Sequence, residues 1–213
     1  MSPAFRARRL LLVAAAPCLV LVSLVERTTA DNVSQTVRLV ALLELRPGMT
    51  VADVGAGRGD LTVLMVPHVG STGRVYSTDI VDERLAEIRA AVSRDHLQNV
   101  VVVKGAERTT NLPDGCCDAI FIRDVYHHFP DPGSMNRSLL TSLKPGGRLA
   151  IIDFVPDVGS KLPNGAPPSR GGHGVLPAQV IEEVTAAGFS HTASIDDWDE
   201  GMFLLLFRKP LGH

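Results

Sequence analysis

Short apolar runs alternate with longer amphipathic segments from residue 33 to residue 208, and this alternation constrains the fold more than any other feature. Apolar runs bounded by glycine, proline or charged residues are typical of strands that are buried on both faces. Apolar residues at three- and four-residue spacing between these runs predict helices. The strands are expected at 49–54, 73–78, 99–103, 118–122, 148–154, 191–195 and 202–208, and the helices at 33–45, 60–69, 82–94, 131–143 and 177–187.

Strands separated by crossover helices require a parallel sheet with helices packed on both of its faces. We therefore predict an α/β fold, doubly wound, with a mostly parallel seven-stranded sheet. The content of 45% hydrophobic and 21% charged residues is typical of one globular domain with a packed core. We place this domain at residues 31–213.

Residues 1–30 form a separate unit at the N-terminus. Three arginines and no acid precede residues 10–25, which carry no charge, and small residues follow at Thr28 and Ala30. This order is typical of a secretory signal peptide. An uncharged stretch close to the roughly 20 residues that span a bilayer also fits an uncleaved membrane anchor, and a misassigned start codon or a buried helix is the third interpretation. The segment predicts an exported or membrane-anchored envelope or periplasmic protein, or a cytoplasmic one if the leader is not functional.

Charge and cysteine content exclude several classes of protein. The chain has 21 Lys and Arg against 23 Asp and Glu, a net charge of −2, so it offers no basic field to a nucleic-acid backbone. We expect no nucleic-acid partner, and contact with a membrane only through the N-terminal segment. The three cysteines cannot form a disulfide framework, because Cys116 and Cys117 are adjacent and Cys18 lies in the leader. The adjacent pair is expected to belong to the core, and nothing indicates the oligomeric state.

The first predicted strand ends in a glycine-rich turn with the sequence Asp53-Val-Gly55-Ala56-Gly57-Arg-Gly59. Glycines let the backbone turn sharply and approach a ligand closely, and open α/β sheets bind ligands at the carboxyl ends of their strands. The spacing differs from the Gly-x-Gly-x-x-Gly of dinucleotide-binding proteins, and Asp53 would repel a pyrophosphate but could pair with an ammonium group. The turn predicts a nucleotide-like cofactor that carries a cation; a turn without a ligand is the alternative.

These motifs, in this order, resemble the class I S-adenosylmethionine-dependent methyltransferases over roughly residues 35–209. The resemblance implies a Rossmann-like fold with S-adenosyl-L-methionine as cofactor, whose methionine part is wrapped by the turn at Gly55, Ala56, Gly57 and Gly59. Asp79, which closes the second strand, matches the acid that hydrogen-bonds both ribose hydroxyls, and the neighbouring Ile80 can pack on the adenine face. A helix N-cap is the alternative role for Asp79.

Two further cofactor contacts are implied by the resemblance. The loop at 104–113 lies where the family contacts the adenine amino group, but this chain has Ala106-Glu107 after a glycine where many relatives have Asp-Ala. Either Glu107 or Thr109 takes that contact beside Ala106, or the contact is absent. Arg123 closes the fourth strand, at whose end the family presents the methyl group, and it is expected to bind cofactor.

A cluster of rings, Tyr126-His127-His128, follows the fourth strand, over the expected position of the methyl donor. Because an imidazole titrates near neutral pH and can accept a proton from the acceptor, His127, His128 and Tyr126 are the candidate catalytic residues. The rings also suit a pocket wall or a cation–π contact with the sulfonium. Either histidine could instead bond to the sheet or cap the next helix.

No metal site is predicted. His127, His128 and His173, with Asp124 or Asp153, form the only candidate ligand set, and adjacent histidine side chains are expected to point about 100° or more apart. The glycine- and proline-rich segment 156–174 is too long for an ordinary connection. In the family this region covers the acceptor, so we expect a lid here.

The resemblance implies a methyltransferase that aligns an acceptor with the sulfonium, excludes water and removes a proton where the acceptor needs it. No basic strip or base-stacking arrangement marks a nucleic-acid substrate, so a small-molecule acceptor is favoured. Two alternatives stay open. One is a non-catalytic cofactor-binding envelope protein that retains the fold, because S-adenosylmethionine is made in the cytoplasm; the other is an NAD(P)-dependent oxidoreductase, which the glycine spacing and Asp53 oppose. The acceptor atom is not indicated.

Overall fold

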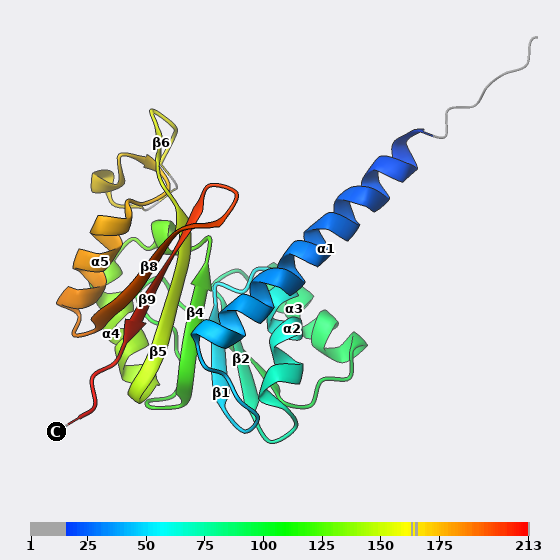
Figure 1. Ribbon diagram of the computed structural model, residues 1–213, viewed down its shortest axis with the longest axis horizontal. Coiled ribbons are helices and arrows are strands. Elements are labelled where there is room, and N and C mark those ends of the chain that lie inside the picture. Colours follow the sequence, from blue (N-terminus) through cyan, green and yellow to red (C-terminus); the bar gives the residue numbers. More distant parts are fainter. Residues whose placement is uncertain (1–15, 163, 165, 213) are drawn as a thin grey trace, which may run out of the picture.

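A single mixed sheet organises the chain. The computed structural model describes residues 16–162, 164 and 166–212, and side chains among them from residue 29 onward except 158 and 169. Residues 1–15 and the side chains of 16–28, which belong to the predicted leader, lie outside the described part. Within that part, seven strands form a sheet in the order β3-β2-β1-β4-β5-β9-β8 (Figure 1). The strands are β1 (Thr50–Val54), β2 (Arg74–Asp79), β3 (Val100–Lys104), β4 (Cys117–Arg123), β5 (Leu143–Phe154), β8 (Ser190–Asp199) and β9 (Met202–Arg208).

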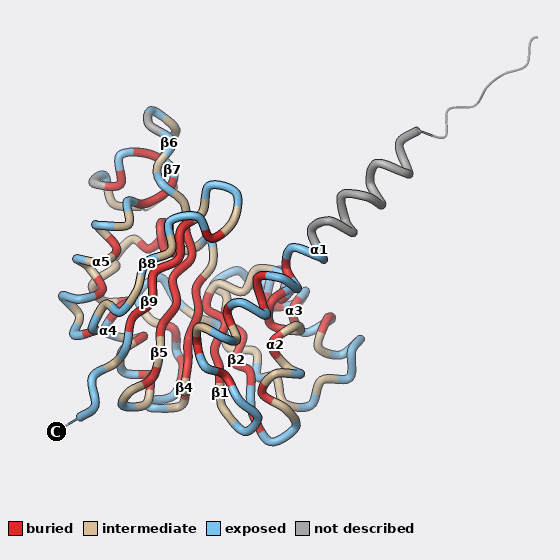
Figure 2. Tube along the Cα trace, in the orientation of Figure 1, coloured by how far each residue is buried: buried red, intermediate tan, exposed pale blue. Residues whose placement is uncertain are grey.

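The first five strands are parallel, and β9 runs antiparallel between β5 and β8. This arrangement confirms the predicted mostly parallel, doubly wound α/β sheet. The apolar runs form strands because both of their faces are buried. On β4, Ala119 and Phe121 belong to one hydrophobic cluster, whereas Ile120 and Ile122 belong to the other. Figure 2 shows the central strands buried along much of their length.

Helices cover both faces of the sheet, as predicted. On one face, α1 (Ala16–Leu42) and α2 (Asp60–Val69) contribute Leu39 and Met65 to the core, and on the other α4 (Pro132–Ser142) and α5 (Pro177–Ala186) contribute Leu139 and Val184. Helix α3 (Asp82–Arg94) packs along β2 and β3. None of the helices in the described part combines the length and the apolar character that crossing a bilayer requires.

Three predicted elements differ from the structure by more than one residue at a boundary. The strand predicted at 191–195 continues to Asp199 as part of β8. The predicted helix 33–45 is the second part of α1, which ends at Leu42. Strand β5 begins at Leu143, so the predicted turn at 144–147 forms its irregular first part. The strand starts early because Gly146 donates a hydrogen bond to the Lys209 carbonyl at 3.0 Å and the Lys209 N–H donates to Gly147 at 2.8 Å, which extends the pairing with β9.

The cysteine pair lies where β4 begins. Cys117 is fully buried in the core and Cys116 is half-buried, and both are free thiols. This burial agrees with the expected structural role of the pair.

The segment after β5 is more ordered than the predicted loop at 156–174. It contains a two-stranded sheet of β6 (Asp157–Val158) and β7 (Gly172–His173), and a 3₁₀ turn, η2 (Pro168–Arg170). The guanidinium of Arg170 is buried and donates to both carboxylate oxygens of Glu183 on α5, each at 3.0 Å. This pair anchors the segment to the body of the fold because a buried guanidinium requires a charged, hydrogen-bonded partner.

The strand order reverses between β1 and β4, which lie side by side in the middle of the sheet (Figure 1). Chains that leave these strands diverge to opposite faces and open a crevice at the carboxyl edge, which is where ligands bind in open α/β sheets. The carboxyl ends of β1, β2 and β4 carry Asp53, Asp79 and Arg123, so the fold brings these three side chains to one edge.

We expect Gly73→Ala to destabilise the fold strongly. Gly73 precedes β2, and a Cβ there would lie 2.4 Å from the Val69 carbonyl oxygen and 2.5 Å from that of Met49. Overpacking against backbone costs up to about 3 kcal/mol, which lowers the midpoint of thermal unfolding by roughly 6–12 °C in a chain of this size. Circular dichroism during heating measures this shift. The matched control is Gly133→Ala on α4, whose new Cβ would meet its neighbours at an ordinary 3.5 Å; equal midpoints for the two variants would contradict the expectation.

Candidate active site

The glycine turn after β1 lies tightly against the rest of the edge. Gly55, Gly57 and Gly59 have φ angles of 76°, 57° and 84°, a backbone region that favours glycine. A Cβ on Gly55 would lie 2.6 Å from the Val125 side chain, whereas one on Gly57 would meet nothing within 4 Å. Gly55 therefore lets the segment after β4 approach, and Gly57 leaves open space beside the turn.

Asp79 fixes the shape of this turn. One carboxylate oxygen accepts a hydrogen bond from the Gly57 N–H at 3.0 Å, and the other accepts from the Val81 N–H at 2.9 Å. The N-cap residue of α3 is Val81, so Asp79 does not take the alternative role of helix cap. Since each carboxylate oxygen can accept two hydrogen bonds, Asp79 keeps acceptor capacity for a ligand.

Asp53 is almost completely buried at the end of β1. Its carboxylate accepts a hydrogen bond from the Thr62 hydroxyl at 2.7 Å, and Thr62 is 2.7 Å from the Ser77 hydroxyl. Burial raises the pKa of Asp53 to about 7, because loss of water outweighs both the Thr62 hydrogen bond and the attraction of Arg123. A cation that binds beside Asp53 would favour its ionised form.

Arg123 is held by the first helix. Its guanidinium donates to the Asn32 side-chain oxygen at 2.7 Å and to that of Gln35 at 3.3 Å, and Gln35 in turn donates to Asp199. Asn32 and Gln35 are buried and lie on one face of α1. This contact fixes a positive charge at the carboxyl end of β4.

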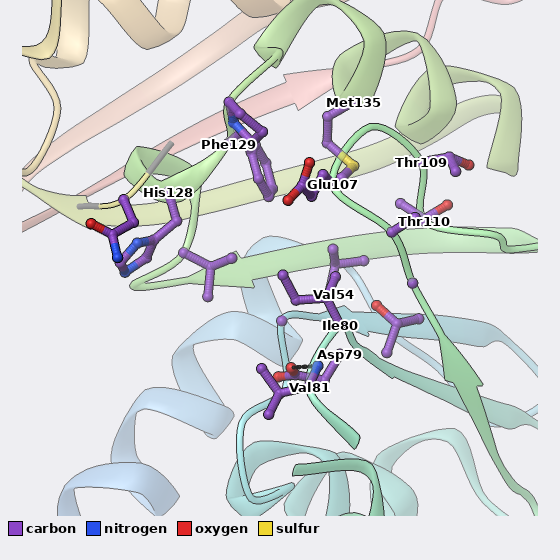
Figure 3. Close-up of a pocket in the computed structure, with 17 residues that line it drawn as sticks. Val54, Asp79, Ile80, Val81, Glu107, Thr109, Thr110, His128, Phe129 and Met135 are labelled. Carbon is purple, nitrogen blue, oxygen red and sulfur yellow. Dashed lines mark hydrogen bonds between the residues drawn. The ribbon is translucent and has the colours of Figure 1, made fainter. Parts of the chain in front are cut away.

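A first cavity of about 330 Å³ lies between the ends of β1, β2 and β3 and the start of α4. Figure 3 shows the side chains that converge on it from the end of β2, from the loop after β3 and from the segment before α4. Apolar groups form most of its walls, and the polar side chains are those of Asp79, Glu107, His128, Asn164 and the three threonines Thr78, Thr109 and Thr110. Its lining includes Val54, Gly55, Asp79, Ile80, Val81, Ala106, Glu107, Thr109, Thr110, Val125, His128, Phe129 and Met135.

Thr109 and Glu107, in the loop after β3, differ in whether other residues already occupy their hydrogen-bonding groups. The Thr109 hydroxyl is 3.1 Å from the Ser138 hydroxyl and accepts a hydrogen bond from the Asn111 N–H at 3.2 Å. The carboxylate of Glu107 forms no hydrogen bond with another residue of the described chain, and the residue is exposed. Glu107 is therefore the better placed of the two to contact a ligand.

A second cavity of about 740 Å³ extends from the first toward the end of β4 and the start of β9. Charged groups of both signs form its walls. They are Asp53, Asp60, Asp79, Asp124, Arg58, Arg84 and Arg123, together with the backbone of the glycine turn. Gly55, Asp79, Val125 and His128 line both cavities, so the two spaces meet at these residues.

Of the ten residues predicted to bind cofactor, nine line these cavities. The exception is Gly59, where α2 begins and where a Cβ would lie 3.3 Å from Ile88, so its role here is packing against α3. The remaining nine are Asp53, Gly55, Ala56, Gly57, Asp79, Ile80, Ala106, Glu107 and Arg123.

The three candidate catalytic residues lie in different surroundings. Tyr126 is fully buried outside both linings, donates to Glu183 at 2.9 Å and accepts from Asn136 at 2.8 Å. Burial and the Glu183 carboxylate raise the pKa of its phenol, which therefore stays protonated at neutral pH. His127 is buried, and His128 is the histidine of this group that lines the cavities.

The two histidines and His173 form a compact cluster. The Nδ1 of His127 is 2.8 Å from an Asp153 oxygen, and its Nε2 is 3.1 Å from the Nε2 of His173. The rings of His127 and His128 have centroids 4.1 Å apart and do not diverge as expected for neighbours in sequence. The two side chains converge because rotation about χ1 and χ2 offsets the angle between their Cα–Cβ bonds.

Two groups that line the second cavity have pKa values shifted in favour of their neutral forms. His128 is exposed, but the surrounding side chains shield part of its ring from water, and this partial desolvation lowers its pKa. The neighbouring His127 and His173 lower it further, so the imidazole is neutral at neutral pH. Burial also raises the pKa of Asp124, which has the uncommon φ of 59° for a residue other than glycine.

The sequence did not identify the residues of α1 that hold Arg123. Asn32 and Gln35 are three positions apart in a helix and so share a face, and this polar pair was the available signal. Arg58 and Arg84 in the second cavity were missed as well, since single arginines at helix starts are common on protein surfaces.

Comparisons with known proteins agree with this geometry. Residues 52–151 match the family model described as a methyltransferase domain. The chain is 36% identical over 116 residues to the ubiquinone/menaquinone biosynthesis C-methyltransferase UbiE of Enterobacter sp. (strain 638), and 37% identical over 110 residues to that of Shewanella sediminis (strain HAW-EB3). These matches span 52% and 51% of this chain and 44% of each relative, so the chain aligns with less than half the length of these curated relatives.

Similarity to solved structures extends over most of both chains. The crystal structure of a SAM-dependent methyltransferase from Aquifex aeolicus has a TM-score of 0.67 and 28% identity, and the match covers 81% of this chain and 88% of that one.

We expect Asp53→Asn to change how stability depends on pH. The pKa of Asp53 is about 7 in the folded protein and near the ordinary 3.8 when unfolded, so the fold takes up a proton between these values. The wild type should therefore lose about 1.4 kcal/mol per pH unit relative to Asp53→Asn as the pH rises through this window. Urea unfolding of both proteins near pH 5 and pH 8 measures the difference. A difference that stays constant with pH, like that expected for the exposed control Asp114→Asn, would show that Asp53 is not a buried titrating group.

Proposed function

Because the chain belongs to the class I S-adenosylmethionine-dependent methyltransferases, we propose that it transfers a methyl group from S-adenosylmethionine to a small-molecule acceptor. One observation carries the proposal: a mainly apolar cavity and a cavity with charges of both signs meet at Asp79. The cofactor has the same order of chemistry, with an adenine, then a ribose, then a zwitterionic amino acid.

The described residues fit each part of the cofactor. The ribose hydroxyls suit Asp79, whose oxygens accept hydrogen bonds at the junction of the cavities. The adenine suits the first cavity, where Ile80 offers an apolar surface and Glu107 an acceptor for the amino group. The amino acid suits the second cavity, where Arg123 can bind its carboxylate and Asp53 its ammonium group. Space beside Gly57 lets this part lie against the turn.

When bound, the cofactor supplies a methyl group already activated by the positive charge of the sulfonium. The chain must hold the acceptor atom roughly 3–3.5 Å from that methyl group and exclude water. His128 lies where the two cavities meet, and its lowered pKa keeps a lone pair available at neutral pH. It can therefore accept a proton from the acceptor. The segment at 156–174 supplies a wall above this position through Asn164, which lines the first cavity.

The acceptor class follows from charge and size. The chain has a net charge of −2, and the described cavities are pockets rather than an extended basic groove. Two of the relatives are named as C-methyltransferases of ubiquinone and menaquinone biosynthesis. Their names support a small molecule as acceptor.

Binding of two thioethers tests how the cavities divide the cofactor. S-Adenosylhomocysteine has all three parts, whereas 5′-methylthioadenosine has adenine and ribose but no amino acid. We expect Asp79→Asn to weaken binding of both compounds roughly 10- to 100-fold, because both contain the ribose. Arg123→Met should weaken S-adenosylhomocysteine roughly 10-fold and leave methylthioadenosine unchanged. Calorimetric titration of the wild type and the two variants with each compound measures the six dissociation constants.

The matched control is Asp82→Asn, which removes an exposed carboxylate three residues from Asp79 that pairs with Lys104 at 2.7 Å and lines neither cavity. It should leave both affinities unchanged. If the wild type bound NADH and neither thioether, the methyltransferase proposal would fail in favour of an oxidoreductase.

We further propose, from the sequence of residues 1–30, that the domain is exported or anchored in the cell envelope. Three arginines before the uncharged stretch favour retention of the N-terminus inside and transfer of the following domain outward. Residues 1–40 fused to an alkaline phosphatase that is active only after export should give activity in a bacterial host. Fusion of residues 31–40 alone is the control. Equal phosphatase activity of the two fusions would contradict an export function.

A further inference from the structure

Three imidazoles meet beside the second cavity, although the side chains of two histidines adjacent in the sequence were expected to point apart. One ring nitrogen from each of His127, His128 and His173 lies within 4.8 Å of the other two. We propose that these residues form a binding site for a divalent transition-metal ion such as zinc. Imidazole nitrogen is a preferred ligand for zinc, copper, nickel and iron, whereas magnesium and calcium prefer oxygen.

The pairing of His127 with Asp153 gives the cluster the arrangement of a metal site. Both side chains are completely buried. Asp153 also accepts hydrogen bonds from the backbone N–H groups of His127 and Phe154, at 3.1 and 2.9 Å. Since a carboxylate surrounded by donors is an acceptor, the proton of His127 lies on Nδ1, and Nε2 carries a lone pair that points at His173. Metal-binding histidines commonly donate their second N–H to a carboxylate, which orients the ring and raises its basicity.

The spacing of the nitrogens suits a shared ion. The two Nε2 atoms of His127 and His173 lie 3.1 Å apart. Two nitrogens bound to one zinc ion at about 2.0–2.1 Å lie about 2.8–3.4 Å apart for angles between a right angle and the tetrahedral angle. Without an ion, the Nε2–H of His173 donates a hydrogen bond to the lone pair on the Nε2 of His127. The same spacing therefore serves a hydrogen bond in the free protein and a metal in the bound one.

His128 and His173 lie at the surface of the cluster, and two carboxylates lie close to it. His128 is exposed, so its ring can rotate toward the other two without loss of core packing. His173 is also exposed, and its backbone N–H donates to the Ser160 hydroxyl at 2.8 Å within the β6–β7 pair, which fixes its position. Asp124, His127 and Asp153 form an overlapping group, so two carboxylates lie near the site. Their negative charge favours a cation there over an anion.

The position of the site gives it a role in the pocket. Three protein ligands leave a zinc ion a further position for a substrate oxygen, as in catalytic zinc sites. His128 lines both cavities, so this position faces the space proposed for the acceptor. An ion held there would bind a hydroxyl or phenol oxygen of the acceptor and make its proton more acidic, so that the proton could leave to solvent water before the methyl transfer and His128 would not be needed as its acceptor. The site itself requires neither cofactor nor methyl transfer.

Zinc binding to the purified full chain, free of affinity-tag histidines, tests the proposal. Calorimetric titration with zinc chloride should give one site per chain. His173→Ala and His128→Ala each remove an exposed ligand and should weaken zinc binding at least 100-fold, while Asp153→Asn should weaken it roughly 10- to 100-fold through His127. His68→Ala on α2, outside the cluster, is the control and should bind zinc like the wild type. Cobalt(II) should give the visible absorption of a four-coordinate site in the wild type and lose it in His173→Ala.

Three outcomes would overturn the site: no zinc binding by the wild type, unchanged zinc affinity in His173→Ala, or equal affinity for magnesium. Circular dichroism of each variant shows whether it is folded, and the two exposed positions keep the test valid if Asp153→Asn does not fold. Because the titration contains no cofactor, its failure leaves the methyltransferase proposal untouched, and failure of thioether binding leaves the metal site untouched.

Discussion

Because both faces of β1, β2 and β4 are buried, these strands can carry polar chemistry chiefly at their ends. Their interiors supply the side chains of two hydrophobic clusters, so the charged residues of these strands lie within two residues of a strand end. Asp53, Asp79 and Arg123 are the charged residues at the carboxyl ends. A parallel sheet aligns these ends along one edge, and the site follows from this burial before any ligand is considered.

At this edge two carboxylates lie close together, and a nearby guanidinium compensates their charge. Asp53 and Asp79 lie near each other, and their repulsion adds to burial in raising the pKa of Asp53. Arg123 offsets this charge, but only because Asn32 and Gln35 hold its guanidinium in place. Helix α1 thus belongs to the site as well as to the core. An amino-acid ligand with one charge of each sign would match this arrangement without adding net charge to a partly buried space.

The sequence predicted the parts of the molecule that depend on local chemistry. The bounds of α2, α3 and β9 agreed with their predicted ranges, because charges, glycines and apolar periodicity mark those ends within the segments themselves. Nine residues of the predicted cofactor site line the cavities, since they follow buried strands whose ends must meet. Contacts between distant segments could not be read in this way. The hold of α1 on Arg123 and the anchoring of Arg170 by Glu183 depend on tertiary packing, which leaves no periodic signal.

The histidine cluster shows why sequence spacing alone misjudges a site of this kind. Neighbouring positions set the directions of the Cα–Cβ bonds, but an imidazole has two rotatable bonds and nitrogens on both sides of its ring. The surrounding structure decides whether the rings converge. Asp153 on β5 orients His127, and β7, twenty residues after Asp153 in the chain, places His173 against His127. A buried carboxylate is costly unless positive charge or donors compensate it. Here the donors are two backbone N–H groups and one imidazole, whose other nitrogen faces outward to the remaining rings. One side chain, His127, therefore compensates the buried charge of Asp153 and also presents a lone pair to His173. Asp153 orients this lone pair although it lines neither cavity.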